Sequence, residues 1–229
     1  MPDLFREIIE ETAIQARSSE FVDQSSGVSV RLTITFLENL VSNLERRALV
    51  TGERRVWPRI VDLRTALSAV TGKVELVHEG EEQGAEAVAR HVLGKAVREV
   101  FLRKFPPVHA KSKRKRGFDA EEGAAAPGTS NPASVYEPIV HWFSAGHTLE
   151  LSDDTAFAEH VAALRSVDGL EDCTRRHAKP DNDGELAGAM ELVLDGLHQC
   201  SMLAKEDADA GVGYRDMIGA MFRQMEEIE

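Results

Sequence analysis

The sequence has few cysteines, few aromatic residues and a shortage of positive charge. Its two cysteines, Cys173 and Cys200, are too few for a disulfide framework. Lysine and arginine number 27 against 39 acidic residues, a net charge of −12, which argues against binding DNA or a membrane over the whole surface. No apolar run approaches the ~20 residues that span a bilayer, and the charged N-terminus lacks the apolar core of a signal peptide. We therefore expect a soluble, cytoplasmic protein without a membrane or nucleic-acid partner.

The sequence also lacks a P-loop. This motif, G-x-x-x-x-G-K-[ST], surrounds nucleotide phosphates with backbone amides and a lysine. Gly72 and Gly94 each precede a lysine, but Leu67 and Ala89 occupy the first glycine position, and neither lysine is followed by serine or threonine. No apolar strand ends in a carboxylate for Mg²⁺. We expect no ATP hydrolysis, no tight ATP binding and no cofactor for this chain alone.

Helical periodicity dominates the first hundred residues. The spacing of apolar residues predicts helices over residues 3–17, from about residue 35 or slightly earlier to 51, over 62–71, and over 84–104. Asp3 and Asp62 are expected as N-caps, and Thr35 with Glu38 fits a capping box. Residues 73–78 alternate in polarity, which is compatible with a short strand. The expected buried stripe of the second helix is Phe36, Leu37, Leu40, Val41, Leu44 and Ala48.

A low-complexity stretch separates the two halves of the chain. Residues 106–134 are rich in Pro, Gly, Ala, Ser and basic residues, which predicts a flexible linker. Beyond it, helical patterns cover residues 135–143, 157–164, 186–203 and 214–228. Because no pattern predicts a substantial sheet, we expect an all-α fold with a helical domain at 1–105, a linker at 106–134 and a second helical domain at 135–229.

One polar turn, residues 22–32, holds the main candidate site. It places Arg31 just ahead of an amphipathic helix, where a planar, permanently charged guanidinium suits phosphate. Gly27 and Ser29 would shape the turn. The other reading makes Arg31 a solvent-facing residue before a capped helix.

The segment Gly27-Val28-Ser29-Val30-Arg31 resembles the G-[AV]-S-x-R sensor-2 motif of AAA+ ATPases in the MoxR and magnesium-chelatase I-subunit group. There the motif opens a helix of the helical lid. The resemblance continues more loosely through residues 44–49 and 58–63, and it covers about residues 1–75.

This resemblance implies that Arg31 reaches the γ-phosphate of ATP, which an upstream αβ core holds with Mg²⁺. The partners would be that core or neighbouring subunits, and such ATPases commonly form rings. The chain would then be the C-terminal part of an ATPase, as a truncated frame, a split subunit or an excised segment. The alternative is a non-enzymatic helical module that binds a protein partner through residues 214–228.

Other residue groups favour structural roles. Cys173, His177, His198 and Cys200 are ligand types for zinc, but the second pair is spaced too tightly. His141, His147 and His160 lie near Asp153 and Asp154 in sequence without a nucleophile. The basic run 111–116 is partly neutralised by nearby acids, so we expect a solvated linker. Core packing is the favoured role of the stripe formed by Met217, Met221 and Met225, with reception of a partner helix as the alternative.

Overall fold

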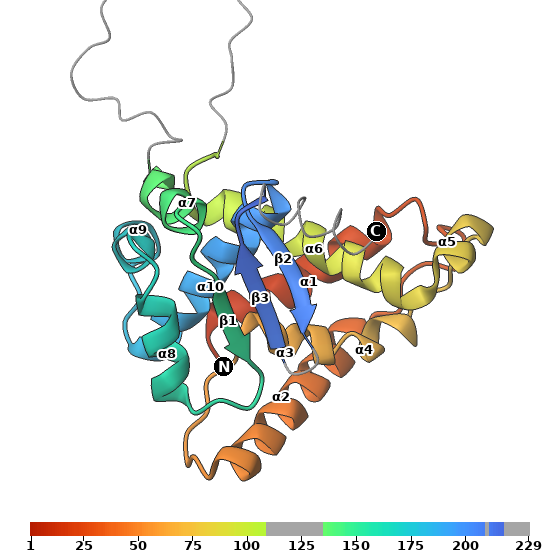
Figure 1. Ribbon diagram of the computed structural model, residues 1–229. Coiled ribbons are helices and arrows are strands. Elements are labelled where there is room, and N and C mark those ends of the chain that lie inside the picture. Colours follow the sequence, from red (N-terminus) through yellow and green to blue (C-terminus); the bar gives the residue numbers. More distant parts are fainter. Residues whose placement is uncertain (109–134, 209–210, 218–229) are drawn as a thin grey trace, which may run out of the picture.

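The computed structural model describes residues 1–108, 135–208 and 211–217, and within them the protein is mostly helical (Figure 1). The helices are α1 (Asp3–Arg17), α2 (Leu32–Thr51), α3 (Ile60–Thr65), α4 (Ser68–Thr71), α5 (His78–Gln83), α6 (Ala85–Lys104), α7 (Glu137–Ser144), α8 (Phe157–Arg165), α9 (Leu170–Ala178) and α10 (Asp183–Gln199). The strands are β1 (Leu149–Ser152), β2 (Ala204–Ala208) and β3 (Gly211–Arg215).

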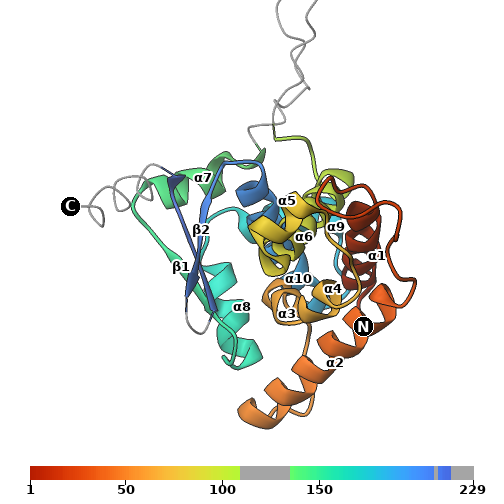
Figure 2. The ribbon, with the colours of Figure 1, turned by 90° about the vertical axis from the view of Figure 1, so that its right-hand side faces the viewer.

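Helix α10 lies at the centre of the molecule. It is apolar on nearly every face, and every residue from Leu186 to Leu197 is buried, as expected for a helix surrounded by other elements. It packs against α6, α8 and α9, and α6 also packs along α1. The helices therefore form a body around α10, while α2 extends along one outer edge (Figures 1 and 2).

A small antiparallel sheet lies on one side of this helical body (Figure 2). Its strand order is β1-β3-β2, with Leu151 paired to Val212 and Lys205 paired to Tyr214. Leu149 and Leu151 alternate with exposed residues, so one face of β1 contributes to the core.

The mostly helical fold agrees broadly with the expected all-α class, and this small sheet is the departure from it. Helix α10 ends at Gln199, and Ser201 then takes a left-handed backbone conformation (φ 59°), so Leu203 is outside the helix in which we expected it. Tyr214 lies in β3 rather than at the start of a helix. Glycine is a poor helix former and valine and tyrosine favour strands, so the Gly-Val-Gly-Tyr sequence of β3 favours extended backbone.

The first two predicted helices are confirmed, with corrections at their starts. The N-cap of α1 is Pro2, and Asp3 is its first helical residue. Helix α2 begins at Leu32, and the Thr35 amide donates to the carbonyl of Arg31, so Thr35 lies inside the first turn and is no cap.

Three other expectations in this half need correction. Asp62 is the third residue of α3, with Arg59 as its N-cap. The helix predicted over residues 62–71 is divided into α3 and α4. Residues 73–78 form only two isolated bridges, Val28–Val74 and Val22–Leu76, before α5 begins at His78.

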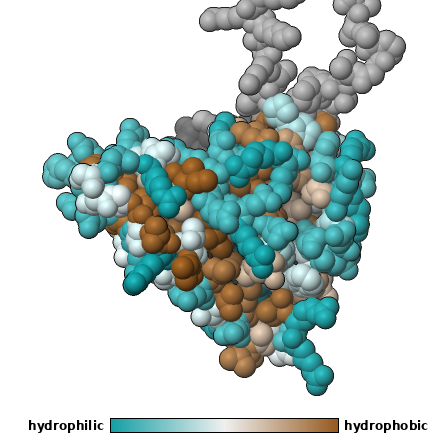
Figure 3. Space-filling model, turned by 180° about the vertical axis from the view of Figure 1, so that it is seen from behind, coloured by the Kyte–Doolittle hydropathy of each residue, from teal (hydrophilic) through white to brown (hydrophobic). Residues whose placement is uncertain are grey.

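Helix α2 carries apolar residues on both of its sides. Phe36, Leu40 and Leu44 are buried as expected, whereas Val41 is 39% exposed and so lies outside the buried stripe. Seen from behind, apolar surface gathers along the edge where α2 lies (Figure 3). The exposed apolar residues in and beside this helix are Val30, Ile34, Val41, Leu49 and Val50.

The two expected domains share one hydrophobic cluster. Phe5 and Phe101 belong to the same buried cluster as Tyr136 and Met190. The stacked ring pair Phe101–Phe105 lies on one side of the predicted linker, and the ring centroid of Tyr136 on the other side is 5.8 Å from that of Phe101. Residues 109–134, most of that linker, lie outside the described residues.

In the described part of the chain, no helix is both long enough and apolar enough to cross a bilayer.

Candidate functional site

The turn that precedes α2 is held by local hydrogen bonds. The Asp23 carboxylate accepts hydrogen bonds from the Ser25 amide at 2.8 Å and the Ser25 hydroxyl at 2.6 Å. These contacts lower the pKa of Asp23. The Gly27 amide donates to the Asp23 carbonyl at 3.1 Å, and Gly27 has a φ of +71°, which favours glycine.

The turn is also attached to the segment that follows α4. The Asp23 amide donates to the Glu75 carbonyl at 2.9 Å, and the Ser29 amide donates to the Lys73 carbonyl at 3.4 Å. Because both bonds involve backbone atoms, the path of the chain up to Arg31 is set independently of its exposed side chains.

Arg31 is the residue immediately before α2, and its side chain is exposed. Its backbone amide donates to the Ser29 hydroxyl at 3.3 Å. Within the described residues, the Arg31 guanidinium forms no ion pair or hydrogen bond. Other arginines on the surface do pair with carboxylates. The sequence prediction that the motif opens a helix is confirmed, and the phosphate contact of Arg31 stays a prediction.

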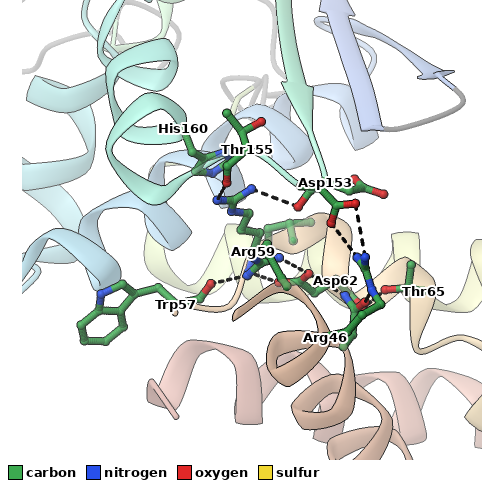
Figure 4. Close-up of polar contacts among 12 residues, drawn as sticks. Arg46, Trp57, Arg59, Asp62, Thr65, Asp153, Thr155 and His160 are labelled. Atoms are coloured by element: carbon green, nitrogen blue, oxygen red, sulfur yellow. Dashed lines mark hydrogen bonds and ion pairs between the residues drawn. The ribbon is translucent and has the colours of Figure 1, made fainter. Parts of the chain in front are cut away.

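A buried charge network fixes the opposite end of α2. The Asp62 carboxylate is 1% exposed and accepts hydrogen bonds from the Arg47 guanidinium and, at 2.7 Å, from the Asn43 amide. The Arg47 guanidinium also donates to the Trp57 carbonyl at 2.6 Å, and Asp62 accepts from the Arg59 backbone amide at 2.7 Å. These contacts fasten α2 to α3 through side chains that are enclosed by protein (Figure 4).

Arg59 connects this network to the second half of the chain. Its guanidinium donates to the carbonyls of Ser152 at 3.1 Å, Asp153 at 3.3 Å and Thr155 at 2.6 Å, all between β1 and α8 (Figure 4). Burial lowers the pKa of Arg59, and the nearby charge of Arg47 lowers it further. Carbonyl oxygens carry only partial negative charge, so nearby carboxylates must balance the rest of the positive charge of Arg59.

Glu191 of α10 supplies part of that compensation. Its Oε2 accepts a hydrogen bond from the Ile60 amide at 2.6 Å, which satisfies a free N–H at the start of α3. Its Oε1 is 2.7 Å from Nε2 of His160, and both side chains are buried. Arg47, Arg59, Asp62 and Glu191 therefore form a charge-balanced network that joins α2 and α3 to α8 and α10.

An exposed ion pair accompanies the buried one. Arg46 binds Asp154 through both terminal nitrogens, at 2.8 and 3.2 Å, and this hydrogen bond lowers the pKa of Asp154 (Figure 4). Burial raises the pKa of the neighbouring Asp153 instead. Four consecutive residues, Ser152 to Thr155, are thus held by Arg46 of α2 and by Arg59, the residue before α3.

The remaining sequence candidates are not gathered into a site. His160 binds Glu191, while His141 and His147 are exposed. Across the described residues, no group of three or more His, Cys, Asp or Glu could hold a metal ion, and Cys173 and Cys200 are free thiols. The basic run 111–116, Met221 and Met225 lie outside the described residues, and Tyr214 is buried and therefore cannot contribute to an exposed docking face.

Most of the buried network was missed from the sequence. Asp62 is predicted only as a helix cap, and no local pattern marks Arg47 as buried. A signal was present in α10, where Glu191 and Asp195 interrupt an otherwise apolar run at a spacing of one helical turn. A carboxylate inside such a run is buried and needs a partner, but the sequence cannot identify the partners, of which the Ile60 amide bound by Glu191 is 131 positions away.

Comparisons of the chain with protein-family models, with curated proteins and with solved structures find no match.

Proposed function

We propose that this chain is the helical lid and C-terminal part of an AAA+ ATPase of the MoxR or magnesium-chelatase-like group, and that Arg31 contacts the γ-phosphate of ATP. The nucleotide and its Mg²⁺ would be held by an αβ core outside this sequence. One observation carries the proposal: an exposed arginine that has no counterion among the described residues stands immediately before a 20-residue helix, within the sensor-2-like sequence.

The surface around Arg31 supports a role at an interface. Val30 is 80% exposed and Ile34 is 58% exposed, and they flank Arg31 on both sides. Contiguous exposed apolar residues mark sites where another protein binds. A core docked over this surface would remove water from Arg31, and a guanidinium–phosphate contact is stronger when water is excluded.

The buried network supports transmission of a movement of α2. Arg47 and Asp62 fasten α2 to α3, and Arg59 and Glu191 fasten α3 to the second half. If Arg31 moves with the γ-phosphate, α2 and the elements around α10 would move with it. Hydrolysis in the core would then displace a surface of the C-terminal half, which could act on a partner.

The experiment begins with the coding DNA upstream of Met1. The proposal expects an in-frame or adjacent segment that encodes a P-loop and a Mg²⁺-binding carboxylate. Purified alone, the present chain should not hydrolyse ATP; together with that core it should, and Arg31→Ala should lower kcat at least tenfold. Arg54→Ala is the matched control, because Arg54 is also exposed and lies near the opposite end of α2.

Two results would contradict the proposal. One is ATP turnover by the isolated chain that Arg31→Ala abolishes, since the chain would then hold the nucleotide itself. The other is the absence of any P-loop-encoding segment upstream of Met1.

The second candidate is a non-enzymatic module that binds a protein partner. The exposed apolar side of α2 favours it, in place of the face at residues 214–228 that the sequence suggested. In that case Ile34→Asp would abolish partner binding, whereas Arg31→Ala would leave it unchanged and no nucleotide would alter it.

A further inference from the structure

A cavity of about 360 Å³ lies among α3, α6, α10 and β2. Its volume is within the range of small-molecule sites. Leu67, Leu93 and Val97 form an apolar part of its wall, and Arg64, Arg90 and Lys205 bring positive charge to it. This combination suits a small molecule with one anionic group and an apolar remainder.

Two arginines converge on one oxygen atom at this cavity. Arg64 of α3 and Arg90 of α6 both contact Oδ2 of Asp207, at 2.6 and 2.5 Å. Asp207 comes from β2, which passes in front of both helices in Figure 1. Two guanidinium groups held this close repel each other, so an anion must lie between them, and a pair of guanidinium forks is well suited to carboxylate or phosphate oxygens.

The Asp207 side chain is more exposed than we expect for a carboxylate with a purely structural role. Its side chain is 49% exposed, whereas that of Arg64 is 20% exposed. Arg64 is therefore held in the wall, while Asp207 and Arg90, whose side chain is 45% exposed, are accessible to solvent. An exposed ion pair contributes little net stability, so exchange of Asp207 for another anion has a small cost.

The opposite wall is fixed and already neutralised. Asp195 of α10 has a side chain that is 6% exposed, and its Oδ1 accepts hydrogen bonds from Lys205 at 2.6 Å and from the Tyr214 hydroxyl at 2.8 Å. Glu86 also pairs with Arg90, at 2.6 Å, so Arg64, Arg90 and Lys205 against Asp195, Asp207 and Glu86 give a net charge of 3 − 3 = 0 among the Arg, Lys, Asp and Glu side chains. When Asp207 is withdrawn, the net charge becomes 3 − 2 = +1.

We propose that this cavity binds a small phosphorylated molecule whose phosphate oxygens replace the Asp207 carboxylate between Arg64 and Arg90. The positive charge left when Asp207 is withdrawn favours an anion there, and the remainder of the ligand packs against Leu67, Leu93 and Val97. Asp207 acts as an internal competitor that fills the anion site when the ligand is absent. The site is independent of Arg31 and of the nucleotide proposed there.

The test measures binding of inorganic phosphate and phenyl phosphate to the full chain by calorimetry, at constant ionic strength set with chloride. Asp207→Asn should bind both probes at least tenfold more tightly than the unmodified chain, because the competitor is gone. Adding Arg64→Gln or Arg90→Gln to that variant should weaken binding at least tenfold. Arg98→Gln is the control: Arg98 lies on α6 with the same side-chain exposure as Arg90, 45%, but does not line the cavity.

The outcomes separate the alternatives. Phenyl phosphate should bind more tightly than inorganic phosphate, and acetate should bind at least fivefold more weakly than phosphate to Asp207→Asn. Absence of phosphate binding by a folded Asp207→Asn variant would overturn the proposal and leave Asp207 as a structural contact. Phosphate binding that Arg98→Gln weakens as much as Arg90→Gln does would also overturn it, because the ion would then bind generally to surface charge.

Discussion

Arg46 and Arg47 are consecutive residues, and each binds an aspartate in a different setting. Arg47 and Asp62 are both 1% exposed at their side chains, whereas Arg46 and Asp154 are 47% and 45% exposed. Removing one partner of a buried pair leaves a charge without compensation in a poorly solvated site, while removal from an exposed pair lets water replace it. The two pairs therefore provide a controlled comparison within one helix.

We expect Asp62→Asn to lower the free energy of unfolding by about 3–5 kcal/mol. Asp154→Asn, the control, should lower it by less than about 1 kcal/mol. Urea unfolding followed by circular dichroism measures both values. Equal effects of the two substitutions would contradict the network that fastens α2 to α3.

Asp154 also makes the exposed pair sensitive to acid. The hydrogen bond from Arg46 lowers the pKa of Asp154 below its value in the unfolded chain. The contact therefore contributes stability above the unfolded pKa, about 3.9, and that contribution is lost as the pH falls through the lower folded pKa.

The corresponding measurement is an NMR titration of the Asp154 carboxyl group. In Arg46→Gln the pKa should rise toward the unfolded value, because the neutral amide cannot favour the charged carboxylate as strongly. A pKa that Arg46→Gln leaves unchanged would mean that the pair is not formed in solution. Lys104→Gln, which removes a cation that pairs with Glu7 instead, is the control.

Individual helices and strands differ in how well the sequence predicts them. The difference depends on whether the contacts that define each element are local or distant in sequence. The bounds of α1 and α6 follow from local information, namely the apolar spacing and the residues that end each helix. Strand β1 pairs with β3, whose residues lie about sixty positions later, so neither strand is recognisable until the chain has folded. The same limit applies to Arg59 and Glu191, whose partners are distant in sequence, whereas Arg31 can be proposed from the sequence because its motif is local.

The crossing of α6 and α10 depends on Gly196. A Cβ atom at this position would lie 2.2 Å from Cγ of the Phe101 ring, much closer than side chains approach. Gly196→Ala should therefore destabilise the protein by about 1–3 kcal/mol or more, because overpacking forces the helices apart. Gly213→Ala is the control, since no heavy atom lies within 4 Å of its added Cβ.

Thermal unfolding of the two alanine variants checks this expectation. Replacing Phe101 with leucine in the Gly196→Ala background should recover part of the loss, since the smaller side chain leaves room for the methyl group. An unchanged melting temperature for Gly196→Ala would contradict the close packing of α6 and α10.

At the scale of the whole molecule, the hydrophobic cluster joins elements on both sides of residues 109–134. The two expected domains should therefore unfold in one cooperative transition. Trp57 belongs to the first half, where its ring packs against Phe157 of the second, and Trp142 belongs to the second half. The variants Trp142→Phe and Trp57→Phe isolate the two signals. Their fluorescence unfolding curves should coincide with those from circular dichroism, and two separate midpoints would instead support independent domains.

The central claim is that Arg31 contacts the γ-phosphate of an ATP molecule that another part of the protein binds. The most direct measurement compares the affinities of the chain assembled with its P-loop core for ATP and for ADP, with and without Arg31→Ala. We predict that the assembled protein binds ATP more tightly than ADP, and that Arg31→Ala removes at least tenfold of this preference while leaving ADP affinity unchanged. An ATP preference that Arg31→Ala leaves intact, in a folded assembly, would contradict the claim.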